Sequence, residues 1–298
     1  MKKWIGAARL RTLPLSISGI ILGSLIAVSQ GHGNWLVFAL AFLTTLFLQV
    51  LSNYANDYGD GIKGTDAERI GEKRAVASGE ISAGQMKNAV ILFSILSVVA
   101  AIALILVSFG TENLRWVLFF LFLTVACLWA AIRYTVGKNA YGYAGFGDVF
   151  VFLFFGIVSV WGSYTLYQHE SFEPSILIPA AAIGFLSTAV LNLNNMRDIE
   201  TDRKAGKWTL PLRMGFKQAK IYQTALLLFP FGLTAVYLVL IGKTEIHHFS
   251  YLLLTIPALL ILKSMFRVKQ PAMLDKELKK VALLTLVFSL ILGISLNF

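Results

Sequence analysis

The amino-acid sequence predicts an all-α polytopic membrane protein with nine transmembrane helices in a single membrane-embedded domain, residues 1–298. Composition is the first reason: 57% of the residues are hydrophobic and 14% are charged, with a mean hydropathy of +0.71, whereas about a quarter of a soluble domain's residues carry charge. The second reason is that apolar runs of about 20 residues, long enough to cross a bilayer, recur along the whole chain. The third is that Lys and Arg gather on one side of these runs.

The first apolar run follows a basic N-terminal segment, MKKWIGAARLRTLPL. We expect this segment to lead into a membrane span rather than to act as a cleaved signal peptide, because no small-residue cleavage site with a polar mature start follows it. The nine predicted spans lie at roughly 12–30, 35–55, 86–109, 114–132, 147–168, 175–196, 218–241, 249–266 and 280–297.

The basic residues orient these spans. Of the 26 Lys and Arg residues, all but Arg115 and Lys243 precede the first span or lie in the loops after spans two, four, six and eight. Because cytoplasmic loops carry the excess of Lys and Arg, the N-terminus is predicted to be cytoplasmic and the C-terminus outside, in the cell (inner) membrane. The net charge of +10 therefore indicates a membrane surface or an anionic substrate as the partner, and no nucleic acid.

A polar stretch closes the second span, in the sequence LSNYANDYGDGIKGTD. On a helix, residues three and four apart share a face, so Asn53 lies one turn from Asp57, and Asn56 one turn from Asp60. Ionisable residues at the edge of a membrane span are costly, and they indicate a functional site by default.

A second polar stretch, NLNNMRDIETDRKAGK, closes the sixth span. Asn194, Asp198 and Asp202 follow one another at four-residue intervals, which predicts a polar stripe along one helix face. Each polar stretch leads into a long basic loop, at about 56–85 and 197–217, and we expect these two loops to cap the cytoplasmic face.

Carboxylate and amide oxygens at this spacing suit Mg²⁺, which takes one or two carboxylates and shares its remaining positions with water and substrate phosphate. The neighbouring Lys and Arg residues suit phosphate oxygens. The sequence has no GxxxxGK[ST] or GxGxxG loop, no HExxH motif, and a single cysteine, Cys127. A diphosphate at the mouth of an apolar cavity, where a metal stabilises the leaving group, therefore predicts an isoprenoid diphosphate as substrate.

Two other interpretations remain open at this point. In the first, the aspartates have no catalytic role: they lie at solvated helix ends and pair with nearby Lys or Arg. A secondary transporter would also carry charges within related halves, although its ionisable residues would lie in mid-span beside broken helices. The position of the carboxylates at helix ends, followed by basic loops, favours an enzyme.

The two polar stretches resemble those of the UbiA superfamily of intramembrane prenyltransferases. The segments NYANDYGD with RIGEKR, and NNMRDIETDRKAGKWTL, carry this resemblance, and RTLP and GFGDVFVFLFFG extend it over essentially the whole chain. NDYGDxxKGTD and RDIETDxxxGK are similar to the members that prenylate 1,4-dihydroxy-2-naphthoate in menaquinone synthesis. The sequence departs from the superfamily pattern at Gly61, where many members have a second acid, and at Trp208, where relatives commonly have a basic residue.

The resemblance implies a UbiA-like helical bundle and an Mg²⁺-dependent transfer from a polyprenyl diphosphate. It implies that Asp57, Asp60, Asp198 and Asp202 are catalytic. The Mg²⁺ ligands would be these four aspartates with Asn53 and Asn194, and the diphosphate contacts would be Lys73, Arg74, Arg197 and Lys207. The charges and glycines of the loop 61–84 allow two interpretations: it closes over the bound diphosphate, or it is a solvated loop whose charges only set the topology.

The resemblance also implies an aromatic acceptor, 1,4-dihydroxy-2-naphthoate, whose ring carbon attacks the allylic cation with loss of CO₂ to give demethylmenaquinol. Other acceptors of the superfamily, namely 4-hydroxybenzoate, homogentisate, a chlorophyllide or haem, stay open. Arg11 and Lys138 would neutralise the acceptor's carboxylate, or else lie at the interface as snorkelling charges. Asp148 would be a substrate-side acid or a favourable charge at a helix N-terminus, and Tyr134 and Asn192 would line the cavity.

Overall fold

A computed structural model of the protein describes residues 1–65, 74–138, 140–169 and 172–298. Within these residues every regular element is a helix, and nine helical segments are long and apolar enough to cross a membrane, which confirms the predicted number. The segments are formed by α1 (Lys2–Ala8), η1 (Leu10–Thr12) and α2 (Leu13–Ser29); α3 (Trp35–Lys63); α4 (Ala83–Phe109); α5 (Leu114–Arg133); α6 (Gly147–Val151), η2 (Phe152–Val158) and α7 (Ser159–Thr165); η3 (Pro174–Ile176) and α8 (Leu177–Arg197); α11 (Phe216–Leu240); η4 (Ile246–Leu254) and α12 (Thr255–Arg267); and η5 (Pro271–Leu274) and α13 (Asp275–Ser295).

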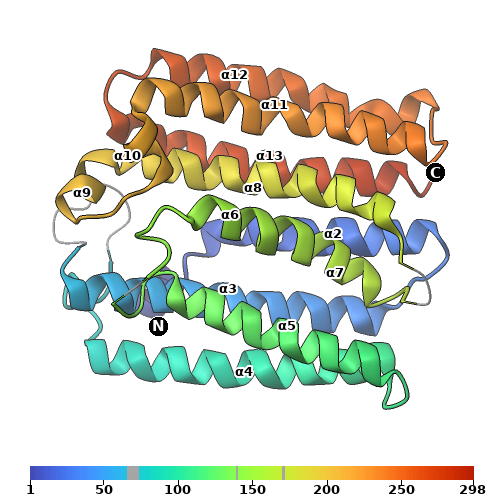
Figure 1. Ribbon diagram of the computed structural model, residues 1–298, viewed down its shortest axis with the longest axis horizontal. Coiled ribbons are helices and arrows are strands. Elements are labelled where there is room, and N and C mark those ends of the chain that lie inside the picture. Colours follow the sequence, from blue (N-terminus) through green and yellow to red (C-terminus); the bar gives the residue numbers. More distant parts are fainter. Residues whose placement is uncertain (66–73, 139, 170–171) are drawn as a thin grey trace.

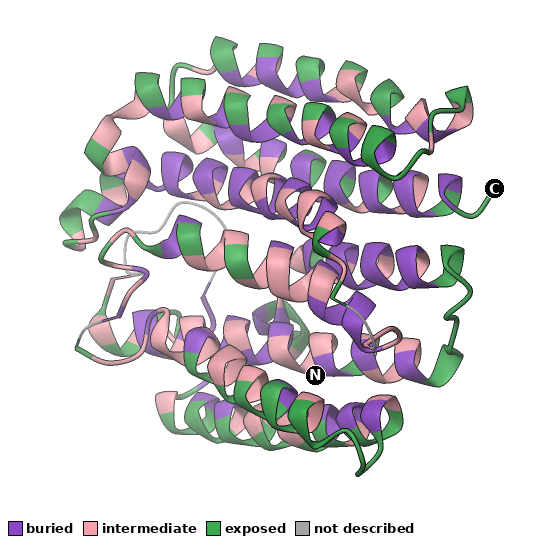
Figure 2. Cartoon of the chain, turned by 45° about the vertical axis from the view of Figure 1, so that its right-hand side comes forward, coloured by how far each residue is buried: buried purple, intermediate pink, exposed green. Residues whose placement is uncertain are grey.

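The long helices lie side by side in one bundle, and two short helices, α9 (Ile199–Lys204) and α10 (Leu210–Met214), gather at one end of it (Figure 1). Helix α8 lies in the interior, where it packs against α11, α13 and η2, and α2 packs against α13 and α7. Burial follows this arrangement, because buried residues concentrate on the inner helices and exposed ones on the outer helices (Figure 2). The exposed faces of the outer helices are apolar, as in Leu92 and Val99 of α4, Phe122 of α5 and Leu259 of α12. A bilayer is the solvent that suits such faces.

Helix α3 carries the first polar stretch, because it continues eight residues beyond the predicted end of span two. The Asn34 side chain caps its N-terminus by accepting hydrogen bonds from the amides of Leu36 and Val37, at 3.0 and 3.3 Å. The helix ends at Lys63 and is followed by Gly64, whose φ of 71° is a left-handed conformation that glycine adopts without strain. All four polar residues of the stretch therefore lie on a regular helix, as their spacing predicts.

The second polar stretch bends at Asp198. Helix α8 ends at Arg197, Asp198 has non-helical dihedral angles (φ −92°, ψ 9°), and α9 begins at Ile199. The Asp202 amide still donates to the Asp198 carbonyl, at 2.8 Å. Asn194 and Asp202 therefore lie on two different helices that share a corner, and not on the continuous stripe expected from their four-residue spacing.

The fifth span is a regular α-helix only at its two ends. Its middle, η2, is a π-helix, an arrangement that is rare and occurs often at functional sites. Here η2 approaches α8 closely, since a Cβ atom built on Gly156 would lie 2.5 Å from the Cα of Gly184. Three side chains of η2, Phe154, Phe155 and Val158, line the cavity described below.

Candidate active site

A cavity of about 430 Å³ lies inside the bundle and contains residues of both polar stretches. Its deeper wall is apolar and includes Leu104, Ile105, Phe120 and Leu123. Its polar wall is formed near the ends of α3 and α8, at the side of the bundle where α9 and α10 lie (Figure 1). The polar residues that line this end of the cavity include Asn56, Asp60, Arg74, Asn194, Asp198, Asp202 and Lys207.

Lys207 joins the two polar stretches. Its Nζ lies 3.6 Å from Oδ1 of Asp60 on α3 and 3.8 Å from Oδ1 of Asp202 on α9. Two carboxylates separated by more than 140 residues in sequence therefore share one ammonium group. Each carboxylate is almost fully buried, so the repulsion between them has to be offset by a nearby cation.

Asp60 accepts further contacts that fix its side chain. The Tyr143 hydroxyl donates to Oδ1 at 2.5 Å, and Nη2 of Arg74 lies 3.5 Å from Oδ2. The Tyr143 ring in turn lies under two ammonium groups, Lys63 at 4.0 Å and Lys207 at 4.8 Å from its centroid. Tyr143 is absent from the predicted set because no motif surrounds it, although its aromatic neighbours Tyr134 and Tyr141 also line the cavity.

Asp57 faces away from this constellation. Its Oδ2 accepts a hydrogen bond from the Ala75 amide and its Oδ1 one from the Val76 amide, both at 3.0 Å, and the residue is 1% exposed. It does not belong to the cavity lining, whereas Asn56, one residue earlier, does. Asn53 lines the cavity too, and its Nδ2 donates to the Ala8 carbonyl at 2.8 Å.

Arg197 is an internal anchor. Its side chain is 1% exposed, and its Nε and Nη2 donate to the two carboxylate oxygens of Asp198, both at 2.7 Å. Nη1 donates to Asp275 at the start of α13 at 2.5 Å, and Nη2 to Oδ1 of Asn194 at 2.8 Å. Arg197 does not line the cavity, so the phosphate contact implied by the resemblance is not evident here. Lys73 lies outside the described residues.

Of the five predicted acceptor-side residues, Arg11 and Tyr134 line the cavity. Burial is the main cause that raises the pKa of Tyr134, with Tyr141 and the carboxylates of Asp148, Asp202 and Asp60 adding to it, so its phenol stays neutral. Lys138 is exposed and is not among the residues that line the cavity.

Asp148 and Asn192 are buried elsewhere in the bundle. The carboxyl group of Asp148 is hydrogen-bonded to Tyr222 on α11. The amide of Asn192 donates to the Ala219 carbonyl at 3.1 Å and to Oε1 of Gln223 at 2.8 Å. Both side chains therefore connect neighbouring helices to α11, and the structure does not bring them to the cavity.

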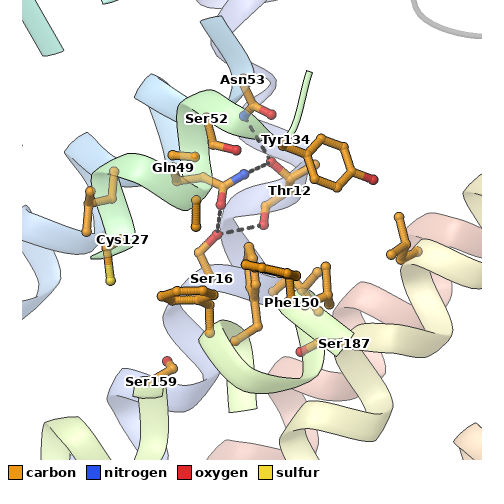
Figure 3. A pocket seen from close by; sticks show the side chains of 18 of the residues that line it. Thr12, Ser16, Gln49, Ser52, Asn53, Cys127, Tyr134, Phe150, Ser159 and Ser187 are labelled. Atoms are coloured by element: carbon orange, nitrogen blue, oxygen red, sulfur yellow. Dashed lines mark hydrogen bonds between the residues drawn. The ribbon is translucent and has the colours of Figure 1, made fainter. Parts of the chain in front are cut away.

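The cavity also contains polar groups that the sequence analysis did not single out. Between α2 and α3, Ser16 donates to Gln49 at 2.5 Å and Gln49 donates to Thr12 at 2.8 Å (Figure 3). Across the same space, the hydroxyls of Ser159 and Ser187 are buried and have no hydrogen-bond partner within the described part of the chain. Their only sequence signal is a polar residue inside an apolar run.

The donor set fits a divalent cation that completes its shell with substrate. No group of three or more His, Cys, Asp or Glu side chains in the described residues is arranged to hold a metal by itself. Asp60 and Asp202, with amide oxygens from Asn56 and Asn194, instead suit Mg²⁺, which usually takes one or two carboxylates and fills its other positions with water and phosphate.

Residues 16–297 match the UbiA prenyltransferase family. The chain belongs to this family. It is therefore a prenyltransferase with several membrane-spanning helices, and the transporter interpretation is excluded. Among UbiA relatives, it is 41% identical to the 1,4-dihydroxy-2-naphthoate octaprenyltransferase of Escherichia coli (strain K12), in an alignment that covers 99% of this chain and 95% of the relative.

Solved structures share the UbiA fold. A UbiA homologue from Aeropyrum pernix K1, solved without ligand, superposes with a TM-score of 0.70 at 17% identity and covers 96% of this chain and 97% of its own. A homologue from Archaeoglobus fulgidus, solved with GPP and Mg²⁺, superposes with a TM-score of 0.58 at 17% identity and covers 96% and 99%. The predicted UbiA-like helical bundle is thus confirmed.

Proposed function

We propose that this prenyltransferase transfers a polyprenyl group from a polyprenyl diphosphate to 1,4-dihydroxy-2-naphthoate, with release of diphosphate and CO₂, to give demethylmenaquinol. The observation that carries the proposal is that Asp60 and Asp202 meet at Lys207 beside a cavity whose deeper wall is apolar. A charged head group suits the polar end and a polyprenyl chain suits the apolar wall. The name of the E. coli relative, at 41% identity over nearly the full length, supports the acceptor.

Mg²⁺ would be held by Asp60 and Asp202. Asn56 and Asn194 line the same cavity and would contribute amide oxygens. When bound, it would neutralise the charge that develops on the departing diphosphate. The homologue solved with GPP and Mg²⁺ supports this cofactor. Lys207 and the guanidinium of Arg74 then provide the fixed positive charges of the protein itself, and both already lie beside Asp60.

The transfer balances without an oxidant or a proton donor. The bond between C1 of the prenyl group and the diphosphate oxygen breaks, and its electron pair leaves with the diphosphate. The ring carbon that bears the acceptor's carboxylate forms the new C–C bond, and the electron pair of its bond to the departing CO₂ returns to the ring and restores its aromaticity. The apolar wall, with Phe150 and Phe154, keeps water from the allylic cation, and ring faces stabilise such a cation electrostatically.

The acceptor's carboxylate is proposed to lie near Arg11. Arg11 lines the cavity, and its Nη1 lies 3.8 Å from Oδ2 of Asp275. The Arg11 side chain is 36% exposed. Tyr134, neutral because burial raises its pKa, would donate a hydrogen bond and not act as a base. Lys138, Asp148 and Asn192 lie away from the cavity lining, so the proposal gives them no acceptor contact.

The membrane orientation belongs to the same proposal. With the N-terminus in the cytoplasm, the cavity's polar end and the loops at 56–85 and 197–217 face the cytoplasm, where a diphosphate substrate would arrive. The cell (inner) membrane then supplies the lipid phase for the product. The bias of Lys and Arg toward this side supports the assignment.

Product analysis tests the proposal directly. Purified protein with Mg²⁺ and a polyprenyl diphosphate is offered 1,4-dihydroxy-2-naphthoate, 4-hydroxybenzoate or homogentisate, and products are identified by mass spectrometry. We expect product only from the naphthoate, with a mass that shows gain of the prenyl group and loss of CO₂. Product from 4-hydroxybenzoate alone would reassign the acceptor. If folded protein formed no prenylated product from any of the three acceptors, the proposal would be contradicted. Asp60→Asn is the inactive control.

A further inference from the structure

Asp57 belongs to the most conspicuous polar stretch of the chain, yet its carboxylate is used inside the protein. Both oxygens accept main-chain hydrogen bonds, from two consecutive amides, Ala75 and Val76, each at 3.0 Å. Two successive amides that converge on one carboxylate form an anion-binding site built by the backbone itself. Charge-assisted bonds of this kind, buried as Asp57 is, are among the stronger hydrogen bonds in proteins.

We infer that Asp57 is a positioning residue that latches the segment Arg74–Val76 onto α3, and that the latch holds the Arg74 guanidinium beside Asp60 for the diphosphate. The inference rests on the proposed function for the identity of the ligand that Arg74 meets. It assigns Asp57 a different role from Asp60, although the two residues are three positions apart in one motif.

Gly61 completes the latch one turn further along α3. A Cβ atom built on Gly61 would lie 2.5 Å from Cγ1 and 2.7 Å from Cβ of Val76, so any larger residue would push the segment away from the helix. Gly61 leaves room for the segment that Asp57 holds.

The rest of the segment is packed in the same way. The Ile81 amide donates to the Ala75 carbonyl and the Gly79 amide to the Val76 carbonyl, both at 3.0 Å, which closes the chain into a compact turn. Ile81 is buried in a hydrophobic cluster with Leu51 of α3 and Met86 of α4. The segment is therefore docked on α3.

Arg74 is the residue that this docking positions. Its side chain is 5% exposed, lines the cavity, and has Nη2 at 3.5 Å from Oδ2 of Asp60. A guanidinium held on the cavity wall can bind two phosphate oxygens at once. The backbone of Arg74 leads directly into the two amides that Asp57 binds. A substitution of Asp57 therefore displaces the Arg74 guanidinium, although Asp57 itself does not line the cavity.

Limited proteolysis without Mg²⁺ or substrate tests the latch apart from any activity. We expect Asp57→Asn to speed trypsin cleavage after Arg74 by about tenfold, since two charge-assisted hydrogen bonds are weakened. Gly61→Ala should speed the same cleavage by displacing Val76, which keeps the test valid if Asp57→Asn folds poorly. Ser78→Ala is the matched control in the same turn and should leave cleavage unchanged, because among the described residues the Ser78 hydroxyl makes only a long 3.4 Å contact with the Ala75 carbonyl.

Binding measurements then separate a positioning residue from a metal ligand. Asp57→Asn and Gly61→Ala should both weaken binding of a non-hydrolysable prenyl diphosphate analogue by about tenfold and leave the Mg²⁺ concentration for half-maximal binding unchanged. Asp60→Asn should raise that Mg²⁺ concentration. If Asp57→Asn raised the Mg²⁺ requirement while cleavage after Arg74 stayed at the parent rate, Asp57 would be a ligand and the inference would be wrong. Cleavage needs no acceptor, so an error in the proposed acceptor would leave this result intact.

Discussion

At the scale of single residues, several buried charges in this protein have defined partners. Arg197 shows the principle most clearly, because its guanidinium joins Asp198, Asn194 and Asp275 and so connects α8 with α13. The family resemblance implies a phosphate ligand for Arg197, but its guanidinium is bound by side chains of the protein. Asp198 lines the cavity, and Arg197 orients its carboxylate.

The Arg197 anchor predicts a large loss of stability on substitution. Arg197→Met should lower the free energy of unfolding by about 3 kcal/mol or more, because the buried carboxylate of Asp198 is left without its cation. Arg203→Met, an exposed position on α9, is the control and should melt with the parent. Thermal unfolding in detergent checks both variants, and equal melting temperatures for all three proteins would rule out the anchor.

At the scale of elements, the sequence predicts the helices well and their local interruptions poorly. Hydrophobic run length and caps define nine spans because the bilayer fixes the length of each helix. The π-helix of η2 and the bend at Asp198 depend on which helix packs against which, as Gly156 against Gly184 shows. Run length carries no information about such contacts.

The same limit applies to the candidate site. Helical spacing correctly places Asn56 and Asp60 on one face, since both line the cavity. It cannot tell that Asp57 faces the backbone of residues 75 and 76, because that depends on where a distant loop docks. Tyr143 and Gln49 carry no motif and enter the site through tertiary packing alone.

The contact of η2 with α8 predicts a sharp difference between two glycines. Gly156→Ala should destabilise the protein by about 1–3 kcal/mol, because the added methyl group would press against the backbone of Gly184 and the Ala180 carbonyl. Gly232→Ala, on the exposed face of α11 where a Cβ meets nothing within 4 Å, should cause no loss. Chemical unfolding of both variants is the measurement, and equal losses would argue against a tight interface at Gly156.

At the scale of the whole molecule, a one-sided distribution of basic residues accompanies an apolar outer surface. Such a molecule suits a bilayer in one orientation, with its polar cavity end toward the basic side. The orientation follows from the positions of Lys and Arg and stays a prediction, because helix packing is the same in either direction across a membrane.

Cysteine labelling in vesicles tests this orientation. In a Cys127→Ser background, Lys204→Cys on α9 should react with a membrane-impermeant maleimide from the cytoplasmic side, and Thr244→Cys, between α11 and η4, from the opposite side. Both positions are exposed, so failure to react reports the membrane and not burial. Labelling of both cysteines from one side would overturn the span count, and labelling with the two sides exchanged would overturn the orientation.

Two polar stretches, far apart in sequence, are proposed to form one diphosphate site. A double-mutant cycle with Asp60→Asn and Asp202→Asn tests it through the Mg²⁺-dependent affinity for a non-hydrolysable prenyl diphosphate analogue. If both carboxylates serve one bound ligand around Lys207, the double variant should depart from the sum of the single effects by more than about 1 kcal/mol. Effects that add to within about 0.5 kcal/mol would mean that the two carboxylates act independently, and would contradict the shared site.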